Sequence, residues 1–296
     1  MSCPSRSSDR ADARVDRVIE KTRISTPAGT FDALASGDED GREVLLLHGF
    51  PESSLEWEQQ LRVLGGGGCR AVAPDQRGYS PGVRPEHVSD YRLEELVGDV
   101  AAIADELGWQ RFDLVGHDWG AIVAWAAAAA MPERVRTLTA VSVPHPAAFE
   151  HARATDEDQH ERSRYIGTFR AAGSAEKTLL ADEADKLRRI YDWKVPEDHI
   201  EHYLDRFTQP GALTAALNWY RAMDLGAEVG PVEVPTLMVW STEDNAVGSA
   251  GVLATEKHVT GPYRLEIVED VSHWIPEEAA EELCRLLIEH LLAHRS

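Results

Sequence analysis

The chain has few cysteines, far fewer basic than acidic residues, and no apolar run long enough to cross a bilayer. Its three cysteines, Cys3, Cys69 and Cys284, are scattered and odd in number, which favours neither a disulfide framework nor a zinc site. Lys and Arg total 30 against 51 Asp and Glu, a net charge of −21. A surface this negative repels nucleic acid and anionic membranes. The longest apolar run, residues 121–131, predicts a buried core helix.

The N-terminus also lacks the apolar core of a signal peptide. Residues 1–14 are polar, contain arginine and aspartate, and are expected to form a disordered leader. Hydrophobic residues make up 43% of the 296 residues, which is ample for a core and a large insertion. These features favour a soluble, cytoplasmic enzyme that binds neither nucleic acid nor membrane.

The most informative motif present is Gly-X-Asp-X-Gly at residues 116–120. The apolar run 112–115 predicts a strand, and the alanine-rich run 121–130 predicts a helix that follows almost directly. A strand that turns so abruptly into a helix strains the central residue, and small residues two positions to either side leave room for it. This pattern is typical of a nucleophile elbow, with Asp118 in place of the usual serine.

Aspartate at this position narrows the chemistry. A serine must lose a proton before it attacks and suits acyl carbonyls, whereas a carboxylate is already ionised at neutral pH. Its attack on a carboxylic ester would give a high-energy anhydride, but attack on a saturated carbon gives a stable alkyl ester. Asp118 therefore indicates displacement at an epoxide or a carbon–halogen bond. The alternative is a glycine-rich turn in which Asp118 only caps the next helix.

Strands and helices alternate along most of the chain. An antiparallel pair is expected within residues 15–36, and helices at about 55–64, 93–107 and 276–294. The other strands are expected at residues 44–47, 70–73, 112–115, 137–143, 236–240 and 264–268. This order predicts an α/β fold with a mostly parallel central sheet flanked by helices, in which reactive groups gather at the carboxyl ends of the strands.

Composition changes after residue 146. Residues 147–226 are charged, rich in helix-start signals and without an evident strand. We interpret them as a helical cap inserted between two parts of the core, residues 15–146 and 227–296.

The positions of three residues indicate a family. Asp118, Asp244 and His273 each follow an expected strand, in the order nucleophile, acid, histidine that is typical of the α/β-hydrolase fold. The sequence resembles that superfamily over nearly its whole length and, within it, is similar to soluble epoxide hydrolases. Four stretches carry the resemblance: residues 48–53, 116–120, 217–221 and 272–274.

The resemblance implies a two-step hydrolysis of an epoxide to a diol, without a cofactor or a metal. Asp118 would form an alkyl ester, and His273, oriented by Asp244, would activate water to hydrolyse it. Backbone N–H groups of Phe50 and Trp119 would hold the oxyanion. The implied partners are a small apolar epoxide and water, and a homodimer is a candidate assembly.

One feature departs from the family pattern, in which two cap tyrosines face the nucleophile. Tyr220 matches the second of them. Where the first is expected the sequence has Thr168, while Tyr165 lies three residues earlier on the same helical face and could substitute.

Other polar residues have simpler interpretations. We expect His48 to hydrogen-bond within the sheet edge, and Asp75 to organise its loop by pairing with Arg77. Two histidine pairs at helical spacing lie in charged stretches, which favours solvated helix faces over metal sites. These pairs are His199 with His202 and His290 with His294.

Two other functions remain open. A haloalkane dehalogenase also uses an elbow aspartate followed by tryptophan. One group of these enzymes has asparagine where this chain has Phe50, and this chain carries the cap residue Tyr220, so both residues favour the epoxide. A ligand-binding or signalling protein of the same fold would usually lack one member of the triad, and this chain has all three residues.

Overall fold

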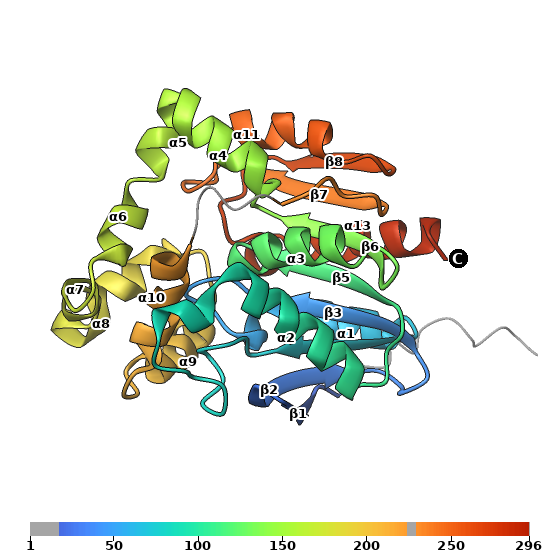
Figure 1. Ribbon diagram of the computed structural model, residues 1–296, viewed down its shortest axis with the longest axis horizontal. Helices are drawn as coiled ribbons and strands as arrows, with labels where there is room; N and C mark the ends of the chain where they lie inside the picture. The colour runs from blue at the N-terminus through green and yellow to red at the C-terminus, as the bar shows by residue number, and fades with distance from the viewer. Residues whose placement is uncertain (1–17, 224–228, 296) are drawn as a thin grey trace, which may run out of the picture.

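The computed structural model describes residues 18–223 and 229–295. The expected leader, residues 1–14, lies outside them. Eight strands form one sheet in the order β1-β2-β4-β3-β5-β6-β7-β8 (Figure 1). Pairs β1–β2 and β2–β4 are antiparallel and all others are parallel, so the predicted α/β architecture is confirmed. The strands are β1 (Glu20–Thr26), β2 (Gly29–Ser36), β3 (Arg42–Leu47), β4 (Cys69–Pro74), β5 (Phe112–His117), β6 (Val135–Val141), β7 (Thr236–Ser241) and β8 (Tyr263–Val268).

Helices cover both faces of the sheet. Successive side chains of a strand point to opposite faces of the sheet. Because β3 is apolar throughout its centre, its side chains belong to two hydrophobic cores, one on each face. Leu45 and Leu47 belong to the core that contains α2 (Leu93–Glu106) and α3 (Trp119–Ala130). Val44 and Leu46 belong to the other, which contains α1 (Glu58–Gly66) and α13 (Ala280–Ala293). The centre of the sheet is therefore buried between two helical layers.

A helical segment joins β6 to β7, and we call its helices α4 to α10 the cap helices. Among residues 142–223 and 229–235, the described part of this segment, no strand occurs. In Figure 1 helices α6 to α10 gather at one end of the sheet. The cap helices are α4 (Pro146–Thr155), α5 (Glu157–Arg162), α6 (Tyr165–Arg170), α7 (Ser174–Leu179), α8 (Ala181–Arg188), α9 (Glu197–Phe207) and α10 (Ala212–Ala222).

The C-terminal segment differs from its prediction as one helix. A short helix, α12 (Ile275–Glu278), is separated from α13 by Ala279, whose φ of −122° is not helical. The break lets the Glu278 carboxylate accept a hydrogen bond from the Ser272 N–H at 2.9 Å. It thereby ties α12 to the loop that carries His273.

Short 3₁₀ helices and one more α-helix complete the described chain. They are η1 (Ser54–Trp57), η2 (Val88–Tyr91), η3 (Arg189–Tyr191), η4 (Thr255–His258) and α11 (Ser249–Ala254). Across residues 18–223 and 229–295, no helix has both the length and the apolar character needed to cross a membrane.

Candidate active site

Asp118 lies at the sharp turn between β5 and α3. Its φ of 49° and ψ of −117° place a non-glycine residue in a strained region of backbone space. It occupies the N-cap position of α3, yet its side chain makes no capping hydrogen bond to that helix. Its Oδ1 instead accepts a hydrogen bond from the Phe50 N–H at 2.9 Å. The capping alternative therefore does not describe this side chain.

Two glycines make the turn possible because the backbone passes close to them. A Cβ on Gly120 would lie 2.0 Å from the carbonyl oxygen of Leu47, at the end of β3. A Cβ on Gly116 would lie 2.2 Å from the carbonyl oxygen of Gly120. The elbow motif thus packs α3 directly against β3 and β5, with Asp118 projecting from the junction.

His273 connects Asp118 to Asp244. Its Nδ1 lies 2.8 Å from Asp244 Oδ2, and its Nε2 lies 3.5 Å from Asp118 Oδ2. Asp244 follows β7 and His273 follows β8. Both therefore lie at the carboxyl ends of parallel strands, as Asp118 does after β5. All three residues are buried. The structure therefore brings together the three side chains that the sequence singled out.

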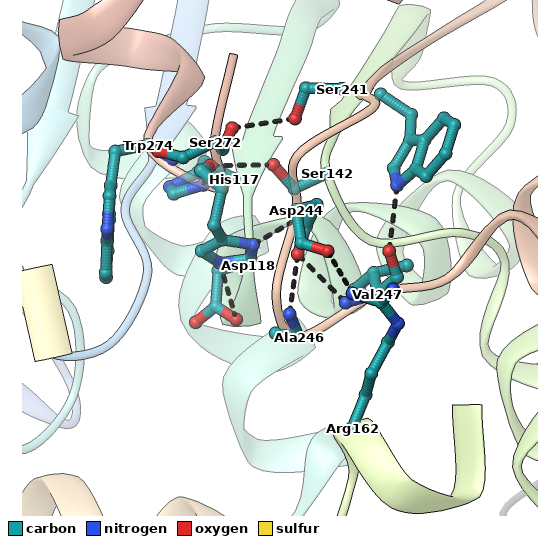
Figure 2. A network of polar contacts seen from close by, with 12 residues as sticks. His117, Asp118, Ser142, Arg162, Ser241, Asp244, Ala246, Val247, Ser272 and Trp274 are labelled. Carbon is teal, nitrogen blue, oxygen red and sulfur yellow. Dashed lines mark hydrogen bonds and ion pairs between the residues drawn. The ribbon is translucent and has the colours of Figure 1, made fainter. Parts of the chain in front are cut away.

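Hydrogen bonds from several elements fix the orientation of this group. Asp244 Oδ1 accepts the main-chain N–H groups of Ala246 at 2.8 Å and Val247 at 2.9 Å, as Figure 2 shows. The main-chain carbonyl of His273 accepts a hydrogen bond from Ser142 Oγ and another from His117 Nε2, each at 3.0 Å. The Asp244 carboxylate and the backbone of His273 are thus held by bonds additional to the one that joins the two side chains.

A cavity of about 370 Å³ opens beside His273 and is lined by Tyr165 and Tyr220. The rings of Tyr165 and Tyr220 are 6.2 Å apart and nearly perpendicular. Tyr220 also packs edge-on against Trp119 at 5.0 Å. Thr168, by contrast, is exposed. The other lining residues are Phe50, Phe169, Arg189, Ile190, Asp192, Asn245, Ala246 and Trp274.

Comparison with known proteins gives consistent results. The sequence profile of the α/β hydrolase fold matches residues 43–280. The AB hydrolase superfamily protein YfhM of Bacillus subtilis is 34% identical over 276 residues, covering 90% of this chain and 96% of that protein. Epoxide hydrolase A of Mycobacterium tuberculosis is 30% identical over 313 residues, with coverages of 90% and 96%. The chain belongs to the α/β-hydrolase family.

A solved structure narrows the placement of this chain within the α/β-hydrolase family. The crystal structure of epoxide hydrolase A from Mycobacterium thermoresistibile matches with a TM-score of 0.82 at 27% identity, covering 93% of this chain and 98% of that one. With the named relatives, this match makes the protein an epoxide hydrolase-like α/β-hydrolase.

Electrostatics in this α/β-hydrolase favour a charged pair between His273 and Asp118. Burial lowers the pKa of His273, but the negative charges of Asp244 and Asp118 outweigh it and raise that pKa well above its ordinary value. Burial alone would raise the pKa of Asp118, and the hydrogen bond and charge of His273 bring it below the ordinary value instead. The carboxylate of Asp118 is therefore ionised at neutral pH.

This pairing predicts a measurable change in Asp118→Asn. Removing the carboxylate removes one of the interactions that raise the pKa of His273, so that pKa should fall while Asp244 keeps it from falling to that of an isolated buried imidazole. Titration of the imidazole by NMR would report the change. Asp205→Asn, at an exposed position of α9, is the matched control and should leave the His273 pKa unchanged. An unchanged value in Asp118→Asn would mean that the two side chains are not coupled.

The cavity tyrosines stay protonated across the physiological range. Burial, then the charges of Asp118 and Asp244, raise the pKa of Tyr165 far above its usual value. Burial, then Tyr165 and Asp118, do the same for Tyr220, against a smaller lowering from a hydrogen bond with the Trp119 indole. Both phenols can therefore act as donors.

Sequence reasoning missed a buried acidic cluster behind His273. His117 Nδ1 lies 3.1 Å from Glu52 Oε2 and 3.5 Å from Glu56 Oε2, and Glu56 also accepts the Gly49 N–H at 3.2 Å. Burial, reinforced by Glu56, raises the pKa of Glu52 to about 8. The ligand atoms of Glu52, Glu56 and His117 lie within 4.8 Å of one another. Their geometry alone would admit a cation, but the raised carboxyl pKa favours shared protons as the balancing charge.

The expected pairing of Asp75 with Arg77 was wrong. Asp75 Oδ2 instead accepts a hydrogen bond from Arg206 of α9 at 2.6 Å, and its Oδ1 accepts the Ser54 N–H. Arg77 forms two 2.7 Å hydrogen bonds with Asp99 of α2. Asp75 therefore joins the loop after β4 to the cap helices.

The expectation of solvated faces was wrong for two of the histidines. His199 is buried, with its Nε2 3.4 Å from Glu58 Oε2, because α9 packs toward α1. His290 is buried on the inner face of α13, where it packs against the ring of His294 at 5.0 Å. His202 is exposed, as expected. His48 is buried at the sheet edge, where its Nε2 accepts the Gln76 N–H at 3.0 Å, in line with its expected place.

Proposed function

We propose that this α/β-hydrolase converts an epoxide to a vicinal diol through an alkyl ester on Asp118. The observation that carries the proposal is the elbow carboxylate, whose Oδ2 lies 3.5 Å from the imidazole of His273, a residue that lines the cavity together with two phenols. The epoxide hydrolase names of its relatives support the same chemistry.

In the first step Oδ2 of Asp118 would attack a ring carbon of the epoxide. Oδ1 is occupied by the Phe50 N–H at 2.9 Å, which leaves Oδ2 as the nucleophile. The carbon–oxygen bond of the ring breaks, and the departing oxygen takes a proton or a hydrogen bond from Tyr220 or Tyr165. A phenol suits this task because an alkoxide is a poor leaving group.

In the second step His273 would take a proton from water, which attacks the ester carbonyl. The oxyanion develops on Oδ1, already within reach of the Phe50 N–H, with the Trp119 N–H as the second donor. Esterification also removes the charge of Asp118, one of the interactions that raise the pKa of His273. The imidazole then loses its proton more readily, so that the first step prepares the base for the second.

The proposed division of the chain fits this mechanism. Residues 15–146 and 227–296 would form the core that carries nucleophile, acid and base, and residues 147–226 the cap that carries both tyrosines. No metal or cofactor enters the scheme, because every proton and electron pair comes from a named side chain or from water.

A dehalogenase would need N–H donors for the departing halide. The Trp219 indole donates to the Arg77 carbonyl at 2.9 Å and does not line the cavity, so it is not placed to be such a donor. This contact and the two phenols that line the cavity favour the epoxide over the halide.

Turnover on styrene-type, aliphatic and terpene epoxides beside haloalkanes tests the proposal. We expect diol from at least one epoxide and no halide release. With enzyme in excess in water enriched in oxygen-18, the first diol should be unlabelled and the label should reside on Asp118, because water attacks the ester carbonyl and the diol keeps an aspartate oxygen. A labelled diol in that first turnover would instead show direct attack of water on the epoxide.

A further inference from the structure

The loop that carries Asp244 is held by the cap as well as by the core. We call residues 244–248 the acid loop. From the core side, the Trp240 indole donates a hydrogen bond to the Val247 carbonyl at 3.0 Å. Asp244 Oδ1 binds two N–H groups of the acid loop itself, so the direction of its carboxylate depends on the path of that loop.

Gln159 of α5 binds the backbone of the acid loop at two points. Its Nε2 donates to the Ala246 carbonyl at 3.0 Å, and its Oε1 accepts the Gly248 N–H at 2.8 Å. The second Nε2 hydrogen is directed to Ser163 Oγ at 3.0 Å. The Gln159 side chain is fully buried, so water has little access to these bonds from the Gln159 side. Both N–H groups of this buried amide and its oxygen have hydrogen-bond partners, which makes the contact specific.

Arg162, one turn further along α5, binds the start of the same loop. Its Nη1 donates to the main-chain carbonyl of Asp244, and its Nε pairs with Asp158 at 2.7 Å (Figure 2 shows Arg162 beside the loop). The approach is close: a Cβ on Gly248 would lie 2.8 Å from Asp158 Oδ2. Helix α5 therefore contacts the acid loop at both of its ends.

We propose that Gln159 and Arg162, both on cap helix α5, are positioning residues. They hold the Asp244 carboxylate in the orientation in which it hydrogen-bonds to His273. Fixing Ala246 and Gly248 fixes the N–H groups that orient Asp244 Oδ1, and this leaves Oδ2 directed at His273 Nδ1 at 2.8 Å. Through Asp244, these contacts link the cap to His273, the proposed base, although neither Gln159 nor Arg162 lines the cavity. The kinetic consequences rest on the proposed function, whereas the geometric ones do not.

Two substitutions test the proposal. Gln159→Glu keeps the shape of the side chain but replaces two buried N–H donors by a carboxylate that repels the Ala246 carbonyl. Arg162→Met removes the bond to the Asp244 carbonyl at a partly exposed position where folding is not at risk. The matched controls are Gln59→Glu in α1 and Arg164→Met, whose side chain is exposed and pairs only locally with Glu161.

The expected kinetic result separates positioning from loss of folded enzyme. A displaced Asp244 slows ester hydrolysis but not ester formation, so kcat and KM should fall together by about tenfold to a hundredfold while kcat/KM stays nearly unchanged. Partial unfolding would lower kcat without changing KM. Both controls should match the wild type.

A second measurement needs no substrate. The proton between His273 Nδ1 and Asp244 Oδ2 should give a downfield proton NMR resonance, identified by its loss in His273→Gln. We expect that resonance to shift or broaden in Arg162→Met and Gln159→Glu. If Gln159→Glu does not fold, Arg162→Met decides alone. A wild-type resonance and unchanged kcat and KM in folded Arg162→Met would overturn the proposal; an enzyme without epoxide turnover but with a shifted resonance would count against the proposed function alone.

Discussion

His273→Gln is expected to stop the reaction at a covalent ester on Asp118. Glutamine cannot accept a proton from water, so ester hydrolysis should slow by about a hundredfold to ten-thousandfold, the range of a lost general base. The first step should survive, because Asp118 keeps the Phe50 N–H and the cavity keeps both phenols. Since formation then outpaces hydrolysis, the ester should accumulate.

Mass spectrometry after mixing with an epoxide would detect the ester. The intact protein should gain the mass of the epoxide, and digestion should place the gain on the peptide that contains Asp118. An Asp118→Asn, His273→Gln double variant should show no adduct. His290→Gln, which changes a buried histidine far along α13, is the matched control and should turn over without accumulating ester. A folded His273→Gln protein that binds the epoxide yet forms no adduct would disprove the two-step scheme.

Local patterns predicted the elements that place the reactive side chains. The apolar strand, the spaced glycines and the alanine-rich helix around Asp118 are all contained within residues 112–130, so the elbow could be recognised without tertiary information. Asp244 and His273 were found because side chains that follow parallel strands gather at one edge of the sheet. Their direct contact at 2.8 Å is the product of that rule.

Contacts between distant residues could not be predicted in this way. Glu52 and His117 lie 65 positions apart and Gln159 and Ala246 lie 87 apart, and no periodicity connects either pair. For Asp75 the sequence suggested a neighbour two residues away, whereas the nearest available cation in space is Arg206, 131 positions away. Charge pairing depends on packing of whole elements, and proximity in sequence is a poor guide to it.

The cap tyrosines illustrate an intermediate case. Helical spacing placed Tyr165 one turn from Thr168, but spacing alone does not say which face of a short helix turns inward. The neighbours decide: Phe169 and Ile166 of α6 are buried, and Tyr165 packs against Phe169 at 5.3 Å while Thr168 faces outward. Thr168 stands where the family pattern has the first cap tyrosine, but it is Tyr165 that lies beside Tyr220 in the structure.

Tyr220→Phe is expected to lower epoxide turnover by about a hundredfold or more, the effect of removing a general acid. The ring of Tyr220 packs against Phe50, Trp119 and Phe169, and phenylalanine preserves these contacts, so the cavity should keep its shape. Only the hydroxyl is lost, and with it the donor for the departing alkoxide. Because ring opening precedes the ester, the loss should appear in the rate of ester formation.

Rapid-quench measurement of ester formation in Tyr220→Phe and Tyr165→Phe would show how much each phenol contributes to the rate of ring opening. Comparable losses would mean that both donate to the epoxide oxygen, and the double variant should then lose nearly all ring opening. Tyr191→Phe is the control, since that phenol is buried against the Pro51 carbonyl and lies outside the cavity. A halide departs without a proton, so a dehalogenase would tolerate Tyr220→Phe. Intact epoxide turnover in that variant, or halide release by a wild type that ignores epoxides, would transfer the assignment to the dehalogenase.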